Sequence, residues 1–82
     1  MTTLDEVLHE VSWWAEGLKL DPKIVKVGSR AAVVIVPPFN TTLVSHLNQR
    51  FVYEPGREEV AYEDGDMVIV RVGPKTFRGI LE

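Results

Sequence analysis

The first apolar residues of the chain recur at helical spacing. They lie three or four positions apart and so fall on one side of an α-helix: Leu4, Val7, Leu8, Val11, Trp14, Ala15 and Leu18. Thr3 and Glu6 have the spacing of a capping box, and Asp21 with Pro22 ends the run. The pattern predicts an amphipathic helix that begins at residue 4 and ends before residue 21.

Two tryptophans are adjacent in this helix and cannot both face its core. Successive helical residues point about 100° apart, so Trp14 falls on the flank of the apolar stripe and Trp13 about 180° from Leu4. The sequence thus predicts that Trp14 is buried and that Trp13 lies among polar residues. In the alternative, the segment around residues 51–57 folds back over Trp13, with the Arg57 guanidinium stacked on the indole.

Residues 23–36 have the pattern of a β-hairpin. Two β-rich runs flank Gly28-Ser29, which suits a type II′ turn and would place Val25 opposite Ala32. Both alternating sets of residues between 31 and 36 are apolar, so the second strand is expected to be covered on both faces.

A second helix is expected at residues 40–51, after two prolines end the strand. Asn40 is the expected N-cap, and Phe39 before it would pack on Val44. This helix would cover part of the strand face that the first helix cannot reach. Its outer positions are polar and uncharged, and they form either an ordinary surface or a second contact face: Thr41, Thr42, Ser45, Asn48 and Gln49.

The remaining residues predict a three-stranded meander with strands near 59–62, 67–72 and 76–81. Asp64-Gly65 fits a type I′ turn, which would place Tyr62 opposite Met67. The predicted fold class is α+β: one compact domain over residues 1–82, in the order α-β-β-α-β-β-β, with two helices packed on a small, mainly antiparallel sheet.

The composition indicates a thin core. A chain of 82 residues buries only somewhat more than about 60% of the surface that it exposes when unfolded. The absence of cysteine excludes disulfides and thiolate zinc sites, which leaves tight packing or oligomerisation to stabilise the domain. The longest uncharged apolar run, residues 31–39, is about half a membrane span, and the acidic start of the chain is unlike a secretory signal. We therefore expect a cytoplasmic protein or a virion component.

Charge is unevenly distributed along the chain, whose net charge is −3. Residues 1–22 carry five acids and one lysine, whereas residues 23–53 carry four basic residues and no acid. Two basic groups, around the first hairpin and the last turn, suit a phosphate backbone: Lys23, Lys26 and Arg30, and Arg71, Lys75 and Arg78. Nucleic-acid binding through these groups is the alternative function, although the acidic balance of the whole chain is atypical of it.

Catalytic and cofactor chemistry find no support in the sequence. Ser45 and His46 are adjacent on a helix and point apart, so they do not form a nucleophile and its base. Glu6 and His9 have the i, i+3 spacing found in bundle metal sites, but they supply only two ligands. No phosphate-binding loop or dinucleotide fingerprint occurs. We predict a protein that is not an enzyme and that uses neither cofactor nor metal.

The predicted function is protein–protein contact or assembly through the first helix. Tryptophan is enriched at interface hot spots because its large ring is buried while its N–H keeps a partner. The expected partner-binding residues surround the outward tryptophan: His9, Trp13, Glu16, Gly17 and Leu20. The partner is another protein or a second copy of the chain, and no membrane is involved. Chains of this kind include oligomeric assembly subunits and phage-encoded structural or inhibitory proteins, and we expect one of these roles.

The nucleic-acid alternative can be tested directly. We expect the wild-type protein not to bind duplex or single-stranded DNA at physiological salt. A phosphate-binding protein would lose affinity steeply between about 50 and 200 mM salt, and reversing Lys26 and Arg30 to Glu would abolish its binding. Fluorescence anisotropy with labelled DNA measures this, and a submicromolar, salt-steep affinity would favour nucleic acid over protein as the partner.

Overall fold

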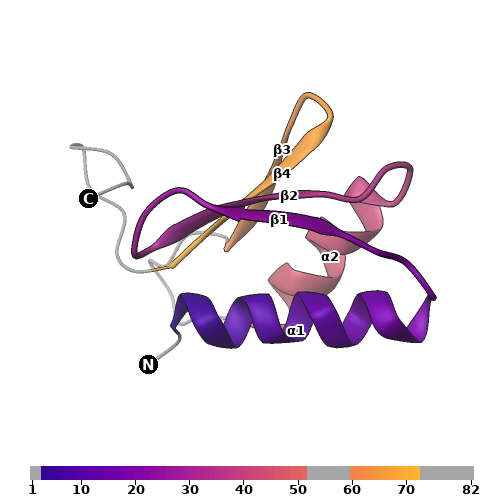
Figure 1. Ribbon diagram of the computed structural model, residues 1–82, viewed down its shortest axis with the longest axis horizontal. Coiled ribbons are helices and arrows are strands. Elements are labelled where there is room, and N and C mark those ends of the chain that lie inside the picture. The colour runs from indigo at the N-terminus through magenta and orange to yellow at the C-terminus, as the bar shows by residue number, and fades with distance from the viewer. Residues whose placement is uncertain (1–2, 52–59, 73–82) are drawn as a thin grey trace.

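The computed structural model describes residues 3–51 and 60–72 of the chain (Figure 1). Its elements follow in the order α1 (Leu4–Gly17), β1 (Lys23–Lys26), β2 (Ala31–Ile35), α2 (Asn40–Arg50), β3 (Ala61–Asp64) and β4 (Met67–Arg71). The four strands form one antiparallel sheet in the order β1-β2-β4-β3. The predicted α+β class is confirmed, while the expected last strand at 76–81 lies outside the described residues.

The start of α1 has the predicted capping box. The Glu6 N–H donates to Thr3 Oγ1 (3.2 Å), and the Thr3 N–H donates to Glu6 Oε1 (2.9 Å). These bonds satisfy donors that the first turn of a helix otherwise leaves unpaired. The prediction for the tryptophans is also confirmed, because Trp14 is 8% exposed and Trp13 is 63% exposed.

The end of α1 differs from the prediction and changes the position of two leucines. The Leu20 N–H donates to the Ala15 carbonyl (2.8 Å) and the Lys19 N–H to the Glu16 carbonyl (3.1 Å), the two bonds of a Schellman motif. Lys19 takes the left-handed position of that motif, with φ of 59°. Leu18, which the helical pattern assigned to the apolar stripe, is therefore exposed. Leu20 turns back and packs against the core, so it does not extend the face of Trp13.

Both helices lie on the same side of the sheet, and α1 runs along that side in Figure 1. Every second residue of the strands points to this side, and these side chains pack with both helices in one core. The core includes Ala32, Val34, Ala61, Val68 and Val70 from the strands, Val7, Val11 and Trp14 from α1, and Leu43 and Leu47 from α2. The expectation that α2 covers the second face of β2 is wrong, because α2 packs beside α1 on the face that α1 already covers.

The first hairpin is shifted by one residue from the predicted register. Val27 N–H donates to the Ala31 carbonyl (3.0 Å), so the loop has three residues, and Val25 faces Val33 and not Ala32. A shift of one residue exchanges the two faces of a strand. In the observed register Ile24 packs against the core, whereas Val25 is exposed on the other face.

The second hairpin turns at Gly65-Asp66 and not at Asp64-Gly65. A type I′ turn needs a positive φ at both central residues, and a type II′ turn only at the first. Gly65 has φ of 66° and Asp66 has no positive φ, so the turn fits type II′. Tyr62 therefore faces Ile69 and not Met67, a shift of two residues that leaves every side chain on its predicted face. The sequence also predicts Arg71 opposite Glu58, which lies outside the described residues, whereas the Arg71 N–H donates to the Val60 carbonyl (2.8 Å).

The start of α2 is also joined to this hairpin. The N-cap is Phe39, which makes no side-chain cap bond, and not Asn40 as predicted. Asn40 is the first helical residue, and its Nδ2 donates to the Asp66 carbonyl (3.1 Å). Asn40 thus connects the helix to the hairpin turn instead of capping the helix.

The two tryptophans should respond differently to truncation. Trp14→Ala opens a cavity in the thin core and is expected to lower the free energy of unfolding by about 3–5 kcal/mol. Trp13→Ala removes an exposed side chain and should change it by no more than about 0.5 kcal/mol. Urea unfolding followed by circular dichroism measures both, and equal losses would contradict the assignment of the two faces.

Candidate functional site

Side-chain contacts to β1 and to α2 flank α1 on both sides. On one flank Lys26 Nζ of β1 donates to Asp5 Oδ1 (3.0 Å). On the other flank Glu10 meets two residues of α2, with His46 Nε2 at 2.7 Å and Arg50 Nε at 3.6 Å. Asp5 and Glu10 lie about 140° apart around the helix, and the arc between them that faces away from the core is centred near Trp13.

Four of the exposed residues of this arc form a surface that we call the Trp13 ridge: His9, Trp13, Glu16 and Gly17. Nothing lies within 4 Å of the position that a Cβ at Gly17 would occupy, so the backbone there is open to a close approach. The structure thus brings together four of the five predicted partner-binding residues. The fifth, Leu20, is half-buried against the core.

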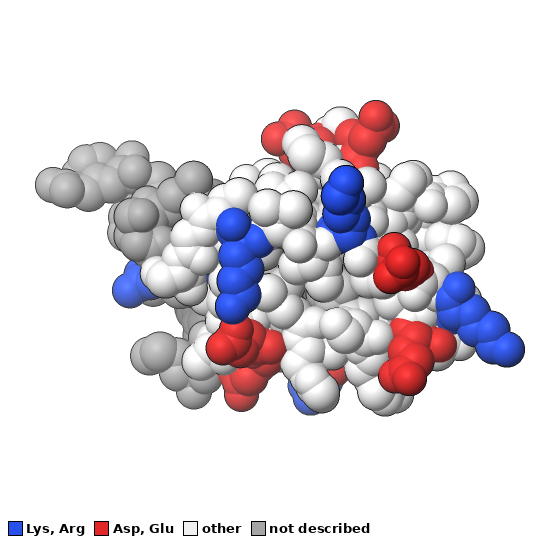
Figure 2. Space-filling model, viewed as in Figure 1, with Lys and Arg blue, Asp and Glu red and all other residues white. Residues whose placement is uncertain are grey.

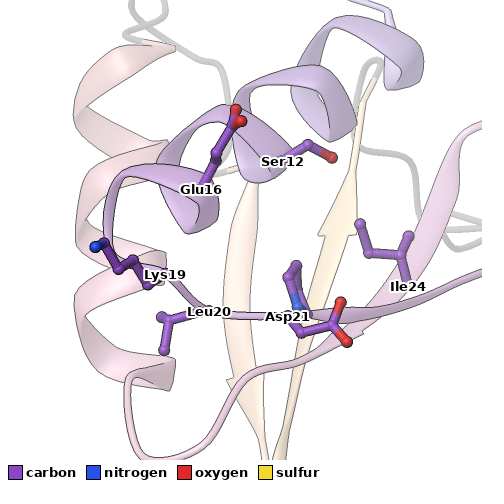
Figure 3. A pocket seen from close by; sticks show the side chains of 7 residues that line it. Ser12, Glu16, Lys19, Leu20, Asp21 and Ile24 are labelled. Carbon is purple, nitrogen blue, oxygen red and sulfur yellow. The ribbon is translucent and has the colours of Figure 1, made fainter.

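A hollow of about 460 Å³ lies beside the ridge (Figure 3). Ser12 and Glu16 of α1 line one side, and the other is lined by Ile24 of β1 and by residues that lead into β1: Lys19, Leu20, Asp21 and Pro22. Glu16 belongs to both the ridge and the hollow. Together with Asp21 it gives the hollow two carboxylates beside the apolar side chains of Leu20 and Ile24.

The contact between Glu10 and His46 was not predicted from the sequence. The Glu10 side chain is 14% exposed and holds both partners from α2, while the His46 ring lies 6.2 Å from the Trp14 ring between centroids. Thirty-six positions separate Glu10 from His46, so no local spacing reveals the pair. The contacts of His46 are the Glu10 carboxylate and the Trp14 ring, and the cluster joins α1 to α2 as a clasp between the helices.

The described basic residues do not form one patch. Lys23 and Lys26 lie on opposite faces of β1, since Lys23 pairs with Ile35 and Lys26 with Ala32. Lys26 is bound to Asp5, Arg30 also has an interaction within the structure, and the Arg71 guanidinium lies 4.8 Å from the Tyr62 ring centroid. Lys75 and Arg78 of the second predicted group lie outside the described residues, as does Arg57, the residue expected in the alternative to stack on Trp13.

Part of the uncharged outer surface of α2 is used within the fold. Asn48 Oδ1 accepts from the N–H groups of Val60 and Ala61 (3.0 Å each), and its Nδ2 donates to the Ala61 carbonyl (3.0 Å). The Thr41 hydroxyl donates to Glu63 (2.7 Å). Thr42, Ser45 and Gln49 remain exposed, so a second contact face on α2, if one forms, is smaller than the sequence suggested.

Within residues 3–51 and 60–72, no three His, Asp or Glu side chains are grouped so that they could hold a metal ion. In the same part of the chain, neither helix combines the length and the apolar character needed to cross a bilayer. Comparisons with protein-family models, curated proteins and solved structures give no match. What points to function is therefore the exposure and pairing of the chain's own side chains.

The clasp between the helices can be tested by one conservative change. Glu10→Gln keeps the shape of the side chain but removes the charge that His46 and Arg50 share, and we expect it to lower the free energy of unfolding by about 1–2 kcal/mol. Glu16→Gln makes the same change at an exposed position of the same helix and should alter it by less than about 0.5 kcal/mol. Equal effects in urea unfolding would show that the clasp contributes nothing.

Proposed function

We propose that the protein is a non-enzymatic binding or assembly subunit that contacts a partner protein through the Trp13 ridge. The observation that carries this proposal is the 63% exposure of Trp13 on the side of α1 that points away from the sheet and from α2. Large aromatic side chains are enriched in interface cores and are usually buried within a fold when no partner needs them.

The energetics require more than the tryptophan alone. Burying about 150 Å² of indole surface at about 25 cal/mol per Å² gives nearly 4 kcal/mol before the entropy of association is subtracted. Leu18 is 47% exposed just beyond the end of α1 and supplies further apolar surface, and Gly17 lets a partner approach the helix backbone. The hollow beside the ridge can accept a side chain from that partner.

The charge around the ridge favours a partner that carries lysine or arginine. Glu6 and Glu16 are exposed on α1, and Glu16 and Asp21 line the hollow. Figure 2 shows acidic side chains along the edge of the molecule formed by α1. Such rim charges steer association and select partners more than they add affinity, so higher salt should weaken binding modestly.

We also propose what kind of partner the protein binds, where the protein comes from and where it acts. The partner is another protein or a second copy of this chain, and small size with an outward aromatic residue suits a phage-encoded structural or inhibitory protein. Its absence of cysteine and the apolar run of only about half a membrane span support action in the cytoplasm or in a virion.

Reversing the character of the anchor residue tests the proposed function. Trp13→Glu should leave the protein folded but abolish retention of its partner when wild-type and variant proteins are immobilised and exposed to an extract of the source cells. Ser29→Glu places the same side chain on an exposed position of the loop between β1 and β2, and this variant should retain the partner as the wild type does. Mass spectrometry identifies what Trp13→Glu fails to retain, and binding is then repeated with that protein purified.

Fluorescence supplies an independent measure of the same contact. Trp14→Phe leaves Trp13 as the only tryptophan while it keeps an aromatic ring in the core, and partner binding should shift the Trp13 emission to shorter wavelength as the indole leaves water. Unchanged emission and equal retention by wild type and Trp13→Glu would mean that Trp13 is an ordinary surface residue.

A further inference from the structure

The face of the sheet that points away from the helices is largely apolar. Alternation along the strands assigns to it the apolar residues that do not belong to the core set: Val25 from β1 and Val27 just after it, Ala31, Val33 and Ile35 from β2, Met67 and Ile69 from β4, and Tyr62 from β3. Val25 is 49% exposed and Val27 46%, Ala31 is fully buried, and the other five are half-buried. We call this surface the open sheet face.

The observed register arranges the open sheet face in rows across the four strands. The central row is Val25, Val33, Ile69 and Tyr62, and it carries no charge. The row at the end near the β3–β4 turn begins with Lys23 on β1, continues through Ile35 and Met67, and ends with Asp64 on β3. The central row is therefore apolar across the whole sheet, and the row near the β3–β4 turn has opposite charges at its two ends.

Lys23 and Asp64 have no ion-pair partner among the described residues, and both side chains are exposed. They cannot pair with each other, since strands are about 4.8 Å apart and three spacings separate β1 from β3, or about 14 Å. The other charge on this face, Arg71, is placed over the Tyr62 ring. The face thus presents an apolar centre with one unpaired positive charge and one unpaired negative charge on opposite edges.

We infer that the open sheet face binds a second copy of this chain, face to face, about a two-fold axis parallel to the strands. This axis places β1 of one copy over β3 of the other, so Lys23 of each copy faces Asp64 of the other and Val33 faces Ile69. A two-fold axis across the strands would instead place Lys23 over Val27 of the second copy and would leave both charges unpaired. The charges therefore select the axis, and the dimer forms two symmetric ion pairs at its rim.

The twist of the sheet is compatible with this arrangement. A twisted sheet has the shape of a saddle. A two-fold rotation about an axis along the strands produces a second saddle of the same shape, parallel to the first, so the two sheets can follow each other's twist. The two faces then stack about 10 Å apart, as in β-sandwiches, over their whole width. Four short strands make a small interface, so the dimer should dissociate in the micromolar range.

Sedimentation velocity over about 5 to 500 µM protein tests the inference. The wild-type mass should rise from monomer toward dimer over this range. Lys23→Glu and Asp64→Lys should each raise the dissociation constant about five-fold or more, because each creates two like-charge contacts, and the double variant should restore it to within about two-fold of wild type. Lys19→Glu makes the same charge change away from the face and should leave it unchanged.

A change at the centre of the face provides a second test. Val33→Glu should give a protein that remains monomeric at every concentration and keeps the circular dichroism spectrum of the wild type. A wild type that is monomeric throughout the range overturns the inference, and if Val33→Glu then also unfolds the protein, the chain itself covers the face. A dimer that Val33→Glu abolishes but that the double charge variant does not restore overturns the proposed axis.

The outcome is separable from that of the proposed function. Trp13→Glu should leave the dissociation constant of the dimer unchanged, since the Trp13 ridge lies on the opposite side of α1 from the sheet. If Trp13→Glu abolishes the dimer and Val33→Glu does not, self-association runs through the ridge, and the inference fails while the proposed function stands. If retention of a partner is insensitive to Trp13→Glu while the charge variants behave as expected, the proposed function fails and the inference stands.

Discussion

The burial of Trp14 is the contact on which the arrangement of α1 depends. Trp14 lies in the core and against the His46 ring, at the line where α1 meets α2. With this side chain inside, the 100° step to the preceding residue turns Trp13 outward whatever the surrounding sequence. The ion pairs from Asp5 to β1 and from Glu10 to α2 hold the same rotation from both flanks. Core packing therefore fixes which position of α1 points outward, and the proposed partner contact explains why that position holds a tryptophan and not a polar residue.

The same core explains why the sheet has an open face. Two helices of 14 and 11 residues cover one side of four strands, and their apolar stripes are used against each other as well as against the sheet. β2 is apolar on both faces, so its second set of side chains has no helix to pack on within the described residues. An open, apolar sheet face is unusual in a protein that acts alone, since antiparallel sheets commonly carry polar residues on the side that faces water.

How far the sequence could predict the structure depended on the range of the interactions involved. The capping box, the faces of α1 and the α+β class follow from spacing within a few residues, and all are observed. The turn after α1 was missed because a lysine, and not glycine, occupies its left-handed position. The hairpin registers depend on loop length, which differs by single residues between turn types. The Glu10 and His46 contact joins residues far apart in the chain, and only the packing of α2 beside α1 brings them together.

The Trp13 ridge and the open sheet face point in opposite directions, with the core and the sheet between them. A dimer through the sheet faces would thus leave both ridges on its outer surfaces, related by the two-fold axis. Because the two ridges would point in opposite directions, such a dimer would bridge two partner molecules and would not hold two sites of one compact partner at once. Self-association would then link separate partner molecules through one small domain. Bridging of this kind would give a domain with so small a core a use for both of its exposed apolar surfaces.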